Sequence, residues 1–494
     1  MLEVSEVGNK ISKADYQAAI PELRVGLINA QYDLRDADFP VIIWIAGDDR
    51  LGANALVNRL NEWMDSRYAD TRVFAEPTEE ESQRPQLWRL WRSLPPKGRA
   101  SFFIGGLMRA ASMRAQEEID EPEFSIWLRH ITNMQHALVA DGALILKFFL
   151  HTPAKEQKKN LKKAEKHPEL GWQVDQRDWA ALDTMGPVLP VAERMLRETS
   201  GPGAPWSIVE ATDDRYRDLT VARTILAALT TRLAQESRAP ATSLPVSVFG
   251  DIDAAADVLS GVDLSRTLDK EKYRAKLAKQ QARLHGLASE AQQRGLSTVL
   301  AFEGWDAAGK GGVIRRITGA LEAGDYRVIP VAAPSEEERR YNYLWRFWRD
   351  LPRAGKFVIF DRTWYGRVLV ERLEGFADPA EWQRAYDEIN DFESQLVERG
   401  LFVAKFWLHV SPEEQLARFK ERENTPYKSH KITAEDYRNR ERWDEYVKAV
   451  DQMILRTTSD GARWNVIPAD DKRYARVAAL KAINKGLART LREN

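Results

Sequence analysis

The chain repeats itself once, and this duplication constrains its fold more than any other feature. The segment LWRLWRSLPPKGR begins at Leu87 and returns as LWRFWRDLPRAGK at Leu344, 257 residues later, with eight of thirteen positions identical. Further along the chain the spacing becomes 258, because LKFFLH around Lys147 matches AKFWLH around Lys405. A solenoid unit spans only about 20–50 residues. The repeat therefore predicts two copies of one complete domain.

The two copies are predicted to occupy residues 1–240 and 255–494, with a Pro- and Ser-rich junction at Glu236–Asp251. Each copy alternates short apolar runs, typical of buried strands, with amphipathic segments, typical of helices. In the second copy such runs begin at Leu296 and Leu401. Strands that are buried on both faces and separated by helices indicate a parallel sheet. We therefore expect an α/β fold in which helices flank a parallel sheet in each copy.

A glycine-rich loop, FEGWDAAGKGG, follows the first predicted strand of the second copy and precedes a helical segment. Its Gly304, Gly309 and Lys310 fit the G-x-x-x-x-G-K pattern of Walker A phosphate-binding loops. The glycines let backbone N–H groups turn toward phosphate oxygens, the helix dipole attracts anions, and the lysine adds a charge. We predict that these three residues bind phosphate together with Gly311 and Gly312. The alternative is an ordinary glycine-rich turn.

Two aspartates predict a metal site beside this loop. The residue after the lysine is Gly311, so the loop lacks the hydroxyl that binds magnesium in ordinary P-loops. Asp306 lies inside the loop, and Asp361 ends the next apolar run, as a Walker B aspartate does. Each aspartate taken alone fits a loop cap. Because both fall at strand ends and Mg²⁺ prefers oxygen ligands, we predict that Asp306 and Asp361 bind Mg²⁺.

Basic side chains follow the second aspartate. The motif DRTWYGR supplies Arg362 and Arg367, and arginine binds phosphate oxygens with a planar fork of donors. A later stretch, Arg418–Tyr446, is rich in Lys and Arg and contains Lys428 and Lys431. It follows the third predicted strand, where nucleotide kinases place a mobile lid that closes over phosphates and excludes water. We predict phosphate contacts from all four side chains, with a solvated charged helix as the alternative for the later stretch.

Three motifs together resemble the type-2 polyphosphate kinase family: GWDAAGKG, DRTWYGR and TPYKSHKITAEDYRNRERWDEY. The fused arrangement resembles the subfamily that transfers phosphate from polyphosphate to AMP, giving ADP. The resemblance implies two tandem P-loop kinase-like domains with a helical lid, Mg²⁺ dependence, and inorganic polyphosphate and AMP or ADP as partners. It also implies that Asp306 and Asp361 handle the magnesium and the acceptor phosphate. Lys310, Arg362 and Arg367 would hold the phosphates during catalysis.

The first copy departs from the family pattern. Its loop, IAGDDRLGANA, keeps Gly47, Asp49 and Gly52, but Ala53 stands where the second copy has its lysine. Ile104 replaces the second aspartate, and glycine and alanine replace the two arginines of DRTWYGR. Such a site cannot hold a metal-bound phosphate group as described above. We therefore expect the first copy to be inactive and structural, and catalysis to take place in the second.

Composition narrows the setting of the protein. There is no cysteine, which excludes disulfides, thiolate catalysis and cysteine-based metal sites. The net charge is −1, from 73 basic and 74 acidic residues, so any surface that binds a polyanion is local. The chain has no apolar run of about eighteen residues, and its first residues lack an apolar core. We therefore expect a cytoplasmic protein without a secretory signal, with no membrane or nucleic-acid partner; homo-oligomerisation stays open.

The sequence leaves two other functions open. One is an ordinary ATP-dependent nucleoside or nucleotide kinase, which would differ in its phosphate donor. The other is a non-catalytic protein that binds polyphosphate or nucleotides, which the intact second loop disfavours. The base of the nucleotide, the choice between AMP and ADP as acceptor, the direction of net flux and any residual role of the first site also stay open.

Overall fold

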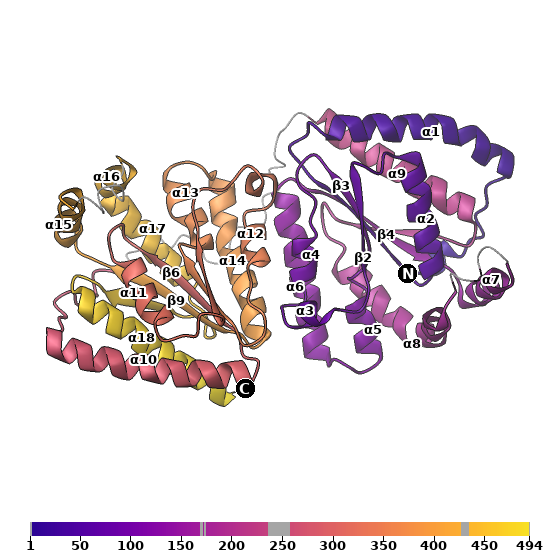
Figure 1. Cartoon of the computed structure of the whole chain (residues 1–494). Helices are drawn as coiled ribbons and strands as arrows, with labels where there is room; N and C mark the ends of the chain where they lie inside the picture. Colours follow the sequence, from indigo (N-terminus) through magenta and orange to yellow (C-terminus); the bar gives the residue numbers. More distant parts are fainter. Residues whose placement is uncertain (1, 168–170, 172–173, 236–256, 426–433, 494) are drawn as a thin grey trace. The chain divides into compact units, whose positions relative to one another are not determined.

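The structure is a computed structural model that describes residues 2–493, apart from 168–170, 172–173, 236–256 and 426–433 (Figure 1). The predicted junction Glu236–Asp251 lies outside the described residues. The chain divides into two compact units. The first comprises Met1–Pro77, Arg89–Thr242 and Glu336–Asn342, and the second comprises Thr78–Trp88, Ser243–Ser335 and Tyr343–Asn494.

The first copy forms a five-stranded, all-parallel sheet in the order β2-β3-β1-β4-β5. Its strands are β1 (Val41–Gly47), β2 (Ala69–Phe74), β3 (Ala100–Gly105), β4 (Leu144–His151) and β5 (Trp206–Glu210). Its helices are η1 (Leu2–Ser5), α1 (Lys13–Leu34), α2 (Arg50–Trp63), α3 (Glu79–Ser82), α4 (Trp88–Arg92), α5 (Arg109–Ala115), α6 (Glu121–Ala140), α7 (Ala154–Lys166), α8 (Gln176–Glu198) and α9 (Asp214–Ala234).

The second copy forms an equivalent parallel sheet in the order β10-β9-β6-β8-β7. Its strands are β6 (Thr298–Gly304), β7 (Tyr326–Pro330), β8 (Phe357–Asp361), β9 (Phe402–His409) and β10 (Trp464–Pro468). Its helices are α10 (Lys270–Gln293), α11 (Lys310–Thr318), η3 (Glu338–Arg340), α12 (Trp345–Arg349), η4 (Trp364–Val368), α13 (Val370–Leu373), α14 (Pro379–Glu398), α15 (Pro412–Glu423), α16 (Ala434–Glu441), α17 (Trp443–Arg456) and α18 (Lys472–Glu493).

The two sheets repeat one another strand by strand. Strands β1 and β6 have equal lengths at a spacing of 257 residues, and β4 and β9 have equal lengths at a spacing of 258. The strand registers agree as well. Ile45 pairs with Ile104 in the first sheet, as Phe302 pairs with Asp361 in the second. The predicted α/β fold, with two tandem parallel sheets flanked by helices, is confirmed.

Helices cover both faces of the second sheet. Successive side chains of a strand point to opposite faces, so the contacts of one strand show which helix lies on which face. On β9, Phe402 lies against Gly486 of α18, whereas Lys405, three residues on, meets Glu393 of α14. Helix α10 runs beside α18 on the first of these faces (Figure 1). The carboxyl ends of β6, β8 and β9 therefore meet at one edge of a doubly wound sheet, where such folds bind their ligands.

The hydrophobic core of the first copy includes Ile104, whose counterpart in the second copy is the polar residue Asp361. Val41, Ile43 and Ile45 of β1 belong to one buried cluster with Ile225 of α9. Ile104, the counterpart of the strand-end aspartate, belongs to the same cluster. In the part of the chain that the structure describes, no helix combines the length and the apolar character needed to cross a membrane.

Candidate active site

The loop after β6 requires glycine at two positions. Gly304 has a φ of +146°, and a Cβ there would lie 2.6 Å from the backbone oxygen of Leu408 on β9. Gly309 has a φ of +106° and caps the start of α11 in the left-handed region. Residues with a Cβ rarely adopt either backbone conformation. The loop therefore passes tightly against β9 and then turns into α11, whose N-terminus lies at the carboxyl edge of the sheet.

Lys310 lies among the charged groups of the predicted site. Its Nζ donates a hydrogen bond to the backbone oxygen of Gly304 at 2.7 Å. Burial lowers the pKa of Lys310, while the carboxylates of Asp306 and Asp361 raise it and the charge of Arg362 lowers it. The hydrogen bond to Gly304 holds Lys310 at the end of β6, and β8, the neighbouring strand, ends at Asp361.

Asp306 is a meeting point of three segments. Its Oδ1 accepts a hydrogen bond from Arg362 at 3.0 Å, and its Oδ2 accepts one from the side-chain amide of Asn439 on α16 at 3.2 Å. Arg362 is half exposed and has a φ of +65°, which is uncommon for a residue with a Cβ. Backbone strain of this kind concentrates at functional sites. The phosphate loop, the segment after β8 and the predicted lid thus converge on one carboxylate.

The remaining loop positions differ in what they offer a ligand. Asp361 is the last residue of β8, pairs in register with Phe302 of β6, and is half buried. The N–H of Gly312 donates to the backbone oxygen of Gly309 at 2.9 Å, so it closes the first turn of α11. Gly311 is exposed, and a Cβ there would meet nothing within 4 Å. The space beside the Cα of Gly311 is therefore open.

Arg367 contacts acidic and aromatic side chains outside the phosphate loop. Its Nε lies 3.2 Å from a carboxylate oxygen of Glu371, and its NH1 lies 3.6 Å from one of Glu381. Its guanidinium also lies 4.5 Å from the centre of the Tyr343 ring. Two carboxylates and an aromatic face hold this side chain. In this structure Arg367 therefore orders the segment that follows β8.

The described part of the predicted lid, Arg418–Tyr446, consists of the end of α15, the whole of α16 and the start of α17, with short non-helical joins at Asn424–Thr425 and Arg442. Lys428 and Lys431 lie outside the described residues. Trp305 of the phosphate loop stacks on Trp443 at the start of α17, with ring centroids 3.7 Å apart and planes 8° apart. This stack joins the phosphate loop to the far end of the lid. Sequence reasoning missed it, because nothing in the residues around either tryptophan indicates its partner.

Arg418 belongs to the same basic stretch but is buried. Its guanidinium donates four hydrogen bonds of 2.6–3.1 Å to the backbone oxygens of Ala307, Ala308, Ala469 and Asp470. An arginine offers five donors in a rigid fork, so one side chain can fix the loop against the segment after β10. Sequence reasoning missed this role too, because a basic residue in a charged stretch shows no sign of burial.

The corresponding loop of the first copy is occupied by contacts of its own. Asp49 caps α2 by accepting a hydrogen bond from the N–H of Gly52 at 3.0 Å, and burial raises the pKa of its carboxyl group. Arg50 pairs with Asp178 at 2.7 Å. Ala53 is buried where the second copy has its loop lysine. The first loop thus serves capping and packing.

A parallel sheet whose first strand runs through a G-x-x-x-x-G-K loop into a helix, with an aspartate at the end of the adjacent strand, defines a P-loop kinase. The chain belongs to the polyphosphate kinase 2 (PPK2) family. The sequence pattern of this family matches twice, at residues 10–237 and at residues 267–494. The resemblance drawn from the three motifs is confirmed, and it extends to both copies.

Similar proteins match over the whole chain. The polyphosphate:AMP phosphotransferase of Pseudomonas aeruginosa is 46% identical over 489 residues, which cover 99% of this chain and 98% of that protein. The protein of the same name from Acinetobacter johnsonii is 34% identical over 476 residues, covering 94% of this chain and 96% of that protein. A crystal structure described as polyphosphate kinase 2 from Pseudomonas aeruginosa PA01 matches with a TM-score of 0.89 at 44% identity, covering 100% of both chains.

Proposed function

We propose that this chain transfers the terminal phosphoryl group of inorganic polyphosphate to AMP, giving ADP, and that the second copy catalyses the reaction. Family membership and the full-length relatives named polyphosphate:AMP phosphotransferase support the activity. One observation carries the assignment to the second copy. In the second copy Lys310 is bonded to the end of β6, Asp361 ends the neighbouring strand β8 and Arg362 pairs with Asp306 at 3.0 Å, whereas the first copy lacks both the lysine and the second aspartate.

The reaction exchanges one phosphoanhydride bond for another. An oxygen of the AMP phosphate attacks the terminal phosphorus of polyphosphate, the bond to the next phosphate breaks, and the shortened chain leaves with the bridging oxygen. The attacking oxygen is already anionic, so no general base is required. The barrier lies in bringing negative groups together and aligning them, and positioning and charge neutralisation lower it. Lys310, Arg362 and the N-terminus of α11 provide positive charge for this purpose.

Water must be kept from the transferring group, since it would hydrolyse polyphosphate instead of phosphorylating AMP. The stack of Trp305 on Trp443 and the hydrogen bond from Asn439 to Asp306 draw the predicted lid onto the phosphate loop. We propose that these contacts hold the lid closed over the phosphates.

We also propose that Asp306 and Asp361 hold Mg²⁺ together with the substrate phosphates. Among the described residues there is no cluster of three or more acidic or histidine side chains that could enclose a metal ion. Magnesium in kinases usually takes one or two carboxylates, substrate phosphates and water, so a pair of aspartates fits it. Bound there, the ion would neutralise charge on the phosphate oxygens. The Asp306 carboxylate would then be shared between the ion and Arg362.

A cytoplasmic location is part of the proposal, and the cysteine-free composition supports it. Inorganic polyphosphate and AMP or ADP are the proposed partners. Neither a nucleic acid nor a membrane is required for this chemistry.

The test is a product analysis. The purified chain is incubated with Mg²⁺, long-chain polyphosphate and each nucleoside mono- or diphosphate in turn, and nucleotides are separated by chromatography. Formation of ADP from AMP supports the proposal. Comparable turnover with ATP in place of polyphosphate would favour an ATP-dependent kinase. Absence of turnover with every pair would favour a non-catalytic binding protein.

A further inference from the structure

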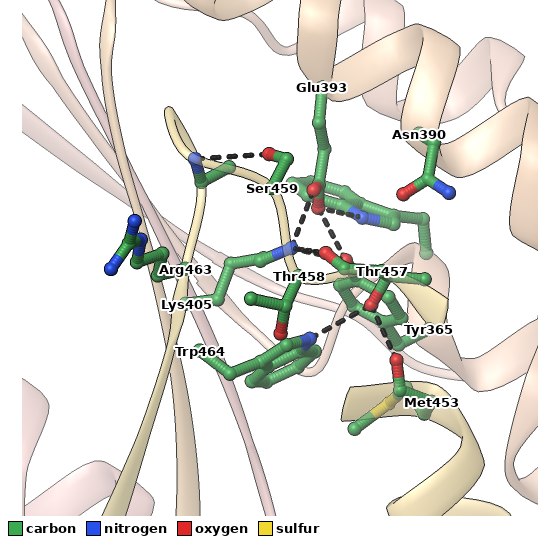
Figure 2. A network of polar contacts seen from close by, with 12 residues as sticks. Tyr365, Asn390, Glu393, Lys405, Met453, Thr457, Thr458, Ser459, Arg463 and Trp464 are labelled. Atoms are coloured by element: carbon green, nitrogen blue, oxygen red, sulfur yellow. Dashed lines mark hydrogen bonds and ion pairs between the residues drawn. The ribbon is translucent and has the colours of Figure 1, made fainter. Parts of the chain in front are cut away.

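Three side-chain donors converge on one buried carboxylate of the second copy, that of Glu393 on α14 (Figure 2). Its Oε1 accepts hydrogen bonds from the Trp364 indole at 3.0 Å and the Tyr365 hydroxyl at 2.6 Å, and its Oε2 accepts one from Lys405 Nζ at 2.7 Å. Lys405 also donates to the Tyr365 hydroxyl at 3.0 Å and to the backbone oxygen of Thr457. All four side chains are buried.

This network holds the middle of the motif DRTWYGR. Trp364 and Tyr365 are its fourth and fifth residues, and the motif begins with Asp361 and Arg362 of the predicted site. Glu393 lies on a helix and Lys405 on β9, so both act on the motif from outside it (Figure 2). Buried charges are stable only when they are paired and hydrogen-bonded. The motif is therefore tied to the core of the sheet by an ion pair.

The first copy contains the same arrangement in reduced form. Its helix α6 matches α14 at a spacing of 258, and Gln135 takes the place of the glutamate. Lys147 Nζ donates to Gln135 Oε1 at 2.7 Å and to the backbone oxygen of Thr199 at 2.6 Å. Leu107 and Met108 stand where the second copy has tryptophan and tyrosine. The lysine and its carbonyl partner are thus kept, while the two aromatic donors are gone.

The difference between the copies follows from counting donors and acceptors. A carboxylate has two accepting oxygens and no donor, whereas a glutamine has one accepting oxygen and a donating NH₂ group. Only the carboxylate can serve a lysine, an indole and a hydroxyl together. In the first copy the Nε2 of Gln135 is buried and finds no acceptor among the described residues. Glutamate therefore accompanies the intact motif, and glutamine accompanies the degenerate one.

The two buried lysines also differ in whether a carboxylate compensates their charge. Burial lowers the pKa of Lys147 to about 7, and no carboxylate counteracts it. Burial also lowers the pKa of Lys405, but there the charge of Glu393 and its hydrogen bond oppose the shift. The pair in the second copy is thus electrostatically complementary, and the lysine fixes the carboxylate that the motif needs.

We propose that Glu393 and Lys405 are positioning residues for phosphoryl transfer. The carboxylate, held by the lysine, fixes Trp364 and Tyr365 so that the charged start of the motif keeps the geometry that transfer requires. This inference rests on the proposed function. A displacement of about 1 Å in catalytic groups can reduce the rate by about 10²-fold, so the effect is measurable although neither residue touches the substrate.

The substitution Glu393→Gln introduces the residue of the first copy. Because the first copy folds with a lysine–glutamine pair, we expect this variant to fold, as checked by circular dichroism and thermal unfolding. Its kcat should fall by about 10²-fold, while the KM for AMP changes by less than about threefold. The matched control is Gln135→Glu, whose kcat should stay within about twofold of wild type because it lies outside the active copy.

A double-mutant cycle separates positioning from packing. If Glu393 acts through the motif, adding Glu393→Gln to Arg362→Ala should lower kcat by less than it does in the wild-type background. Independent, multiplicative losses would overturn the proposal. So would a folded Glu393→Gln variant with wild-type kcat. If that variant does not fold, Tyr365→Phe removes only the hydroxyl, and a kcat equal to wild type would again overturn it. A wild-type chain without turnover would refute the proposed function instead.

Discussion

The two loop aspartates, Asp49 and Asp306, occupy equivalent positions in the two copies, but the structure gives them different tasks. Asp49 caps α2 through the N–H of Gly52. Asp306 does not cap α11, because the N-cap of that helix is Gly309, and the Asp306 carboxylate accepts hydrogen bonds from Arg362 and Asn439 of the lid instead. Changing each aspartate to alanine should therefore affect different properties of the protein. Asp49→Ala should lower stability and spare the rate, whereas Asp306→Ala should lower the rate and spare stability.

The magnitudes follow from these contacts. Loss of an N-cap costs about 1 kcal/mol of unfolding free energy, which corresponds to a fall in Tm of about 2–4 °C for a domain of this size. The ion pair of Asp306 involves a half-exposed arginine, and such pairs contribute about 0–1 kcal/mol. The same carboxylate is proposed to hold Mg²⁺ at the transferring phosphate. By analogy with other preorganised electrostatic groups, removing it should lower kcat by about 10²–10³-fold.

The assay is ADP formation at saturating polyphosphate, AMP and Mg²⁺, with thermal unfolding followed on the same preparations. Asp49→Asn is the matched control, because asparagine also caps helices well and should leave both Tm and rate unchanged. A loss of rate in Asp49→Ala as large as that in Asp306→Ala would refute the reasoning. The first copy would then be catalytic, and the interpretation of its loop as a capping element would be wrong.

Four further predictions concern the second copy. Lys310→Ala should lower kcat by about 10²–10³-fold without unfolding the protein, and retention of half the activity would exclude the proposed role. Asp361→Asn should raise the Mg²⁺ concentration needed for half-maximal rate; an unchanged Mg²⁺ titration would identify this carboxylate as a loop cap. Burial lowers the pKa of His409 from its usual 6.5 to about 4, and its Nδ1 accepts a hydrogen bond from the loop tryptophan. The unfolded state therefore binds a proton that the folded state does not between those two values, so lowering the pH from 7 to 5 should remove about 2 kcal/mol of unfolding free energy. Urea denaturation at pH 7 and pH 5 should show that loss of unfolding free energy in the wild-type chain and not in the His409→Gln variant. Equal losses in both proteins would contradict the lowered pKa of His409. Residues 255–494 expressed alone should be less stable or less soluble than the whole chain, because the compact second unit also includes Thr78–Trp88; a fragment with the Tm of the full chain would argue against this.

The sequence by itself determined the architecture and the centre of the site. The repeat predicted two equivalent sheets, because residues at a constant spacing carry the same apolar pattern and therefore form the same strands. Asp306, Lys310 and Asp361 could be placed together because the carboxyl ends of neighbouring parallel strands meet at one edge. The sequence also showed that the first loop is degenerate, because uncharged Ala53 and Ile104 stand where the second copy has its lysine and its second aspartate.

Only the tertiary structure decided which polar side chains are buried and what they meet. The phosphate contact of Arg367 stays a prediction, and only the structure shows that Glu371 and Glu381 lie beside its guanidinium. Arg418 only marked the start of a basic stretch in the sequence, but in the structure it is hydrogen-bonded to four backbone oxygens. Lys405 served in the sequence only to mark the repeat, and its partner Glu393 was not singled out.

The physical reason is the same in each case. A loop or a strand owes its form to neighbouring residues and their periodicity, so local sequence predicts it. A buried charge owes its role to the partner that compensates it, and that partner comes from a segment that only folding brings near. The lysines of β4 and β9 could be recognised as equivalent from the sequence. Whether each faces a glutamate that holds a catalytic motif or a glutamine that holds nothing further was decided by the packing of a helix against the sheet.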